Sequence, residues 1–289
     1  MTATGVLFRV LNVMLMIGIP VLAAFFLARR GKGGFRPIWI GALAFVLSQA
    51  GHLPFNRFLL LPGLRSAGVD LAASGGWSLI ILGLAVGLSA GVFEEAARYL
   101  VFRYWLPWRG GRLLPVKYGI GHGGVEALLT GLLVLFALVQ VLVLGSGAPL
   151  QAFSPEEAQI IQSQLEAYWA VPWGQALLGA WERVSALLFH LGASLLVFKG
   201  VREKKLGWVA AAVLGHTALN AVAVIGVKTM DLYLLEGVLF LFALCWAAWA
   251  WLLRVQDQPV QEPASSPPLK IEKSTAPVPP ERLEESRYE

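Results

Sequence analysis

Long apolar runs separated by short polar segments fill the first 255 residues of this 289-residue chain. Seven of the runs are long enough to cross a bilayer as a helix, which takes about 20 residues. The pattern predicts an all-α integral membrane protein, with a seven-transmembrane helix bundle over residues 1–255. The predicted spans are about 6–27, 38–60, 77–103, 118–144, 175–198, 206–227 and 232–253.

Two segments outside these runs have a different pattern. Ser154 and Glu157 have the spacing of a capping box, with Pro155 at the first helical position. Apolar residues follow at helical spacing, so we expect an amphipathic surface helix over about 155–169. From residue 256 to residue 289 the chain is rich in Pro, Ser and mixed charge without apolar periodicity, which predicts a disordered cytoplasmic tail.

Composition agrees with a membrane protein. The chain is 57% hydrophobic and 14% charged, whereas soluble domains average about 25% charged residues. We therefore expect the lipid bilayer as a partner and no nucleic acid. In such a chain the basic residues of the loops set the orientation of the protein in the membrane. The loops after the first, third and fifth runs carry four basic residues each, and the other three carry one, none and one. This asymmetry predicts a multi-pass protein of the cell membrane, N-terminus outside and C-terminus cytoplasmic.

Ionisable and amide side chains inside the apolar runs are the candidate chemistry. A charge at the bilayer centre costs a few kcal/mol on insertion scales, so such groups mark pairing, a wet cavity or catalysis. Four helices running in alternate directions bring the candidates to one level, about 12–15 Å from the cytoplasmic face at a rise of about 1.5 Å per residue. The candidates are Glu94, Glu95, Arg98, His122, Glu126, His190, His216 and Asn220.

This polar layer predicts a hydrolytic metal centre reached from the cytoplasm. Neutral imidazoles and carboxylates are common zinc ligands, and catalytic sites keep a position open for water. A second carboxylate nearby can act as general base on that water. Glu94 and Glu95 point about 100° apart on a helix, so spacing leaves open which is base or ligand and which is a structural partner.

Simpler interpretations exist for the same residues. Glu94 and Arg98 could form only a buried ion pair, and His190 or His216 could be a hydrogen-bonded core histidine. As a whole, the layer also fits a proton-coupled transporter, a non-enzymatic membrane scaffold or a bis-histidine haem protein. A further polar stripe in the second run is expected to form interhelical hydrogen bonds or an access path toward the outer leaflet. Its residues are Gln49, His52 and Asn56.

Four short motifs within the runs carry these side chains. They read FEEAARY at 93–99, GHGGVEA at 121–127, FH at 189–190 and HTALN at 216–220. Together they resemble the YhfC family of intramembrane metalloproteases, which is similar to the type II CAAX prenyl proteases and the PrsW proteases. The arginine follows the paired glutamates one residue sooner than in the CAAX proteases.

The resemblance implies a zinc-dependent endopeptidase. Glu94 or Glu95 would be the general base on water, and Asn220 would stabilise the developing oxyanion. The expected substrate is a membrane-embedded or lipidated peptide or protein, cleaved near the cytoplasmic leaflet. The catalytic residues implied are Glu94, Glu95, Arg98 and Asn220, and the implied zinc ligands are His190, His216, Glu126 and His122.

Overall fold

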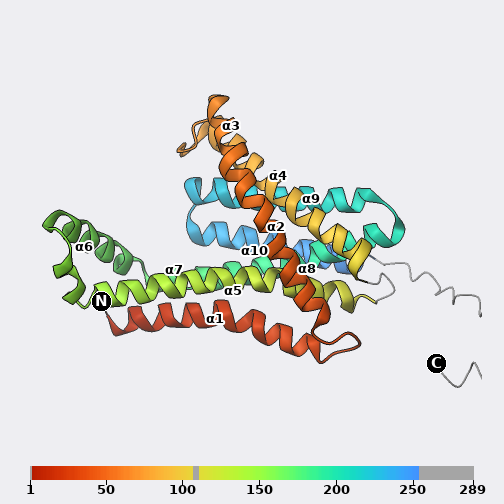
Figure 1. The fold of residues 1–289 in the computed structure, drawn as a ribbon, viewed down its shortest axis with the longest axis horizontal. Coiled ribbons are helices and arrows are strands. Elements are labelled where there is room, and N and C mark those ends of the chain that lie inside the picture. The colour runs from red at the N-terminus through yellow and green to blue at the C-terminus, as the bar shows by residue number, and fades with distance from the viewer. Residues whose placement is uncertain (1, 107–110, 254–289) are drawn as a thin grey trace, which may run out of the picture. The chain divides into compact units, whose positions relative to one another are not determined.

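The computed structural model describes residues 2–106 and 111–253, and all the regular structure in these two ranges is helical (Figure 1). The described residues form one compact unit. The tail predicted over 256–289 lies outside the described residues. Seven helical segments are long and apolar enough to cross a membrane, so the predicted all-α membrane architecture is confirmed. The orientation of the termini stays a prediction.

Seven long helices form these spans: α1 (Ala3–Ala28), α2 (Arg36–Phe55), α4 (Gly76–Leu100), α5 (Leu113–Leu144), α8 (Leu178–Glu203), α9 (Leu206–Thr229) and α10 (Leu232–Leu252). The shorter elements are α3 (Leu61–Ser66), α6 (Pro155–Ala170), α7 (Trp173–Ala176) and the 3₁₀ helix η3 (Ala148–Ala152). Two π-helical turns, η1 (Asn56–Leu60) and η2 (Val101–Trp105), prolong α2 and α4. The second span therefore runs on through α3 to Ser66, six residues past the predicted end.

Side-chain caps begin three of the helices where the sequence supplies them. The Thr2 hydroxyl caps α1. Asp231 accepts hydrogen bonds from two backbone N–H groups at the start of α10. At α6 the Ser154 hydroxyl accepts from the Glu157 N–H, and the Glu157 carboxylate accepts from the Ser154 N–H. Such reciprocal caps satisfy backbone groups that have no partner inside the helix.

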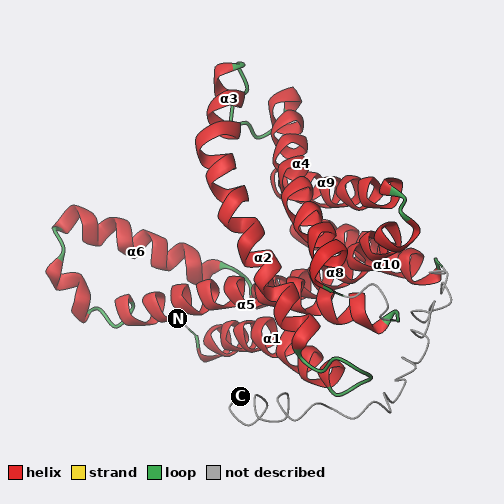
Figure 2. Cartoon of the chain, turned by 45° about the vertical axis from the view of Figure 1, so that its right-hand side comes forward, coloured by secondary structure: helices red, strands yellow, loops and turns green. Residues whose placement is uncertain are grey.

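Helix α8 lies at the centre of the bundle. In the most apolar 18-residue stretch of its span, 72% of the residues are buried, against 17–33% in the corresponding stretches of the other spans. It packs against α5, α9 and α10, while α4 packs along α9 and α2 crosses α5 (Figures 1 and 2). The α2–α5 crossing needs a glycine, because a Cβ at Gly121 would lie 1.9 Å from the Ile38 carbonyl oxygen. These packed helices carry the polar layer.

Candidate functional site

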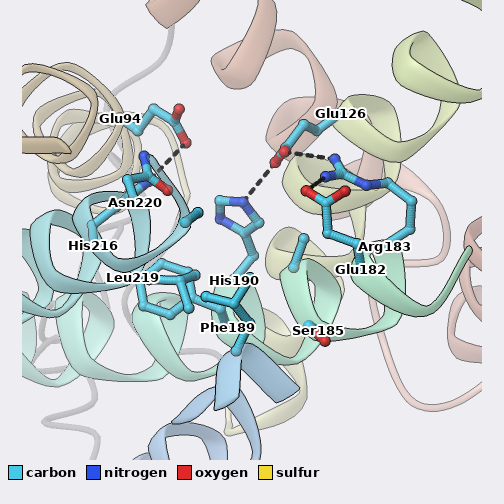
Figure 3. Close-up of a pocket in the computed structure, with 13 residues that line it drawn as sticks. Glu94, Glu126, Glu182, Arg183, Ser185, Phe189, His190, His216, Leu219 and Asn220 are labelled. Carbon is cyan, nitrogen blue, oxygen red and sulfur yellow. Dashed lines mark hydrogen bonds and ion pairs between the residues drawn. The ribbon is translucent and has the colours of Figure 1, made fainter. Parts of the chain in front are cut away.

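Helices α4, α5, α8 and α9 surround a small cavity of about 100 Å³ (Figure 3). Five of the predicted site residues line it, Asn220 among them. Asn220 lies on the Glu94 side of the cavity (Figure 3). Glu95, Arg98 and His122 are not part of the lining but contact residues that are. The polar residues around the cavity are Glu94, Glu126, Glu182, Arg183, Ser185, His190, His216 and Asn220.

The carboxylate of Glu94 connects three helices. Its Oε2 lies 3.0 Å from Nε2 of His122 on α5 and 3.8 Å from Nε2 of His216 on α9. Its Oε1 accepts a hydrogen bond of 2.9 Å from the Gln49 amide on α2. Glu94 is buried, so these neighbours replace the water that would otherwise solvate its charge.

Glu95 has a different environment from its neighbour. Arg98 Nη1 donates to both of its oxygens, at 2.8 and 2.7 Å, and both side chains are fully buried. The ion pair considered between Glu94 and Arg98 is therefore wrong: the arginine pairs with Glu95. Residues three apart lie on one helix face, whereas the Glu94 carboxylate turns into the cavity. Glu95 Oε1 also lies 2.9 Å from His216 Nδ1.

In their neutral forms, which are the forms that bind metals, the two histidines take opposite tautomers under these contacts. A guanidinium can only donate, so His190 Nδ1, 3.1 Å from Arg98 Nη2, accepts. The His190 proton is then on Nε2, 2.8 Å from Oε2 of Glu126. In His216 the carboxylate of Glu95 accepts from Nδ1–H, so the Nε2 lone pair faces Glu94.

Arg183 and Gln49 lie outside the predicted set of site residues and belong to the same hydrogen-bond network. Arg183 Nη1 donates to Glu126 Oε1 at 2.9 Å and also pairs with Glu182. Arg183 lies seven residues, two helical turns, before His190, and that spacing could have placed it on the same face. The contact between Gln49 and Glu94 depends on how α2 crosses α4, and no spacing within one helix indicates it.

The donor set fits a metal ion. One oxygen of Glu94 and a ring nitrogen each of His122 and His190 lie within 4.8 Å of one another, and all three residues are buried. Zinc holds nitrogen and oxygen ligands at about 2.0–2.2 Å, so donors this close could share one ion. His122 Nδ1 is buried without a hydrogen-bond partner among the described residues, so one ring nitrogen of this buried histidine has no protein partner. His216 Nε2 adds a third imidazole beside Glu94.

A bundle of seven membrane-spanning helices around a buried glutamate–histidine cluster defines a polytopic membrane protein with a candidate metal site. The sequence profile of the family described as "YhfC intramembrane metalloprotease" matches residues 14–239, and the chain belongs to this family. The resemblance noted from the motifs is thus confirmed, and the family's description implies a metal.

One curated relative is similar over part of the chain. It is "Uncharacterized membrane protein YhfC" of Bacillus subtilis (strain 168), 32% identical over 152 residues. The match covers 48% of this chain and 54% of that protein, so the chain aligns with about half of the relative's length. No solved structure matches the chain.

Proposed function

We propose that the protein is an intramembrane zinc-dependent endopeptidase. It hydrolyses a peptide bond of a membrane-embedded or lipidated substrate near the cytoplasmic leaflet. The observation that carries the proposal is the meeting of Glu94 with His122, His190 and His216 at one buried point, beside a cavity. The description of the family supports the same reaction class.

In this proposal Glu94, His122 and His190 hold the zinc ion, with His216 Nε2 beside them. A zinc ion there supplies Lewis acidity toward a peptide carbonyl and toward water. His190 can ligate only through Nε2, because Arg98 occupies Nδ1. To do so the ring must lose its Nε2 proton, and Glu126 Oε2 at 2.8 Å can accept it.

The two motif glutamates then have separate tasks. Glu94 faces the cavity, so as a zinc ligand it lies where the reacting groups would be. Glu95 is a positioning residue: it accepts a hydrogen bond from Nδ1–H of His216, which turns Nε2 toward Glu94. A carboxylate behind a histidine in this way fixes the tautomer and orientation of a metal ligand.

Three further side chains complete the site. Arg98 neutralises Glu95 and orients His190 by donating to Nδ1, and Glu126 faces Nε2, where it can take the proton that ligation displaces. The Asn220 amide lines the cavity and can donate to an oxygen that gains negative charge. The cavity of about 100 Å³ is smaller than ligand pockets, which measure about 300–1,000 Å³. A peptide chain therefore needs the helices around it to separate.

The proposal is tested by zinc content and cleavage together. Purified protein in proteoliposomes is assayed for bound zinc and for cleavage of a panel of membrane-anchored peptides. We expect about one zinc per chain, and Glu94→Gln should lower cleavage at least about 100-fold. Glu182→Gln is the matched control, because among the described residues that glutamate pairs with Arg183 at the cavity and forms no hydrogen bond or ion pair with the histidines. Equal cleavage by metal-free and zinc-loaded protein would overturn the proposal.

A further inference from the structure

A second polar cluster lies next to Glu94 and outside the cavity lining. It joins α2 and the start of η1 to α4. Ser89 and His52 are both buried, so their hydrogen bonds must be satisfied within the protein. The members are Gln49, His52, Asn56 and Ser89.

The hydrogen bonds of this cluster run in one direction. Asn56 Nδ2 donates to His52 Nε2 at 2.9 Å, and the Ser89 hydroxyl, 3.1 Å from the same nitrogen, donates to Asn56 Oδ1 at 2.8 Å and so fixes which way the Asn56 amide points. The proton of a neutral His52 is then on Nδ1, 3.0 Å from Gln49 Oε1, which can only accept. The Gln49 amide N–H is thereby directed at Glu94 Oε1, at 2.9 Å.

The backbone supports this arrangement. Positions 49, 52 and 56 are three and four residues apart and share one helix face. The π-helical turn begins at Asn56, and π-turns inside helices are frequent at functional sites. The ring of Phe93, next to Glu94 on α4, packs against the His52 ring at 5.6 Å between centroids. His52 is thus held in place on both its edge and its face.

We infer that His52 is a positioning residue for the Glu94 carboxylate, acting through Gln49. The chain fixes which way the Gln49 amide points, and the amide occupies Oε1, so that Oε2 is the oxygen presented to His122 and His216. The inference deepens the proposed function and rests on it, because the carboxylate being oriented is the proposed zinc ligand. Partners of this kind behind a metal ligand change metal affinity by about 10–100-fold.

The test measures zinc affinity of the full-length protein in detergent by competition with a chelator of known affinity. His52→Leu removes the Nδ1–H donor, and Gln49→Met removes the amide that contacts Glu94. Each is expected to weaken zinc binding about 10–100-fold. His52→Asn places an amide N–H near the position of Nδ1, and should recover most of the loss.

Asn12→Leu is the control for a purely structural effect. Its side chain accepts a buried hydrogen bond from the Ala180 N–H, distant in sequence from the Glu94 network. This variant should lower thermal stability without changing zinc affinity. Zinc affinity of His52→Leu within twofold of wild type, with Gln49→Met weakened, would overturn the role of His52 alone. Absence of zinc binding by the wild-type protein would instead overturn the proposed function, and the inference with it.

Discussion

Two regions of the bundle each bury an arginine, and they satisfy its charge in different ways. In the site, Arg98 pairs with Glu95 and donates to His190. At the other region, where α1 meets the end of α6, Arg9 donates to the carbonyl oxygens of Gly5, Tyr168 and Val171, at 3.1, 2.6 and 3.1 Å. Arg98 thus connects titratable side chains to one another, whereas Arg9 connects backbone carbonyl groups.

The difference matters because the partners do different things. Carbonyls at a helix C-terminus have no partner inside the helix, and Tyr168 and Val171 are at the C-terminal end of α6. A cation there also complements the helix dipole, and Arg9 lies over the Tyr168 and Trp169 rings at 4.8 and 4.9 Å. Arg9 thus links α1 to the C-terminal end of α6, whereas Arg98 sets the protonation and orientation of groups around the cavity.

Arg98→Met should have the largest effect. It leaves Glu95 as a buried charge without its cation, and breaking a buried pair from one side costs about 3–5 kcal/mol. Thermal unfolding in detergent measures the loss. The double variant Glu95→Leu with Arg98→Met removes both charges and should recover much of the stability. Zinc binding should stay weak in both variants, because His190 loses its Arg98 partner in each and His216 loses Glu95 in the double variant. Full zinc affinity in the double variant would show that this arginine, too, is only structural.

Much of this site could be predicted from the sequence. Apolar length marks the spans, and alternating basic loops put residues of antiparallel helices at a common depth, which brought Glu94, Glu126, His190 and His216 together. Partners within the layer could not be predicted, because they depend on rotations of about 100° per residue and on helix crossing angles. That is why Arg98 was matched with Glu94, and why the interhelical hydrogen bond expected of Gln49 is confirmed although its partner, Glu94, was not identified.

Arg9→Met should have an intermediate effect on stability, confined to the contact between α1 and the C-terminal end of α6. Three hydrogen bonds from a charged group are lost, and the carbonyls at the end of α6 lose a buried partner. Leaving such groups unsatisfied costs about 1–3 kcal/mol. Hydrogen exchange should rise in the last turn of α6, around Tyr168, while zinc affinity stays at the wild-type value. Arg9→Lys keeps one donor and should fall between. A loss of zinc affinity equal to that of Arg98→Met would break the distinction between the two regions.

The smallest expected effect is a pH dependence of the stability of the first turn of α6, at the other end of that helix. Hydrogen bonds from the Ser154 backbone N–H and hydroxyl lower the pKa of the exposed Glu157 carboxyl. A carboxyl whose folded pKa is depressed stabilises the folded state above its unfolded pKa, and that contribution is lost as pH falls through the folded pKa. The first turn of α6 should therefore lose exchange protection in acid, below the usual range of a glutamate near 4.3. Glu157→Gln can keep the cap without titrating, so it should abolish this pH dependence. Ser154 lies seventeen residues before Val171, the last carbonyl that Arg9 contacts, so Arg9 should hold the C-terminus of α6 while the N-terminus frays. Acid release of both ends together would mean that α6 docks as one unit.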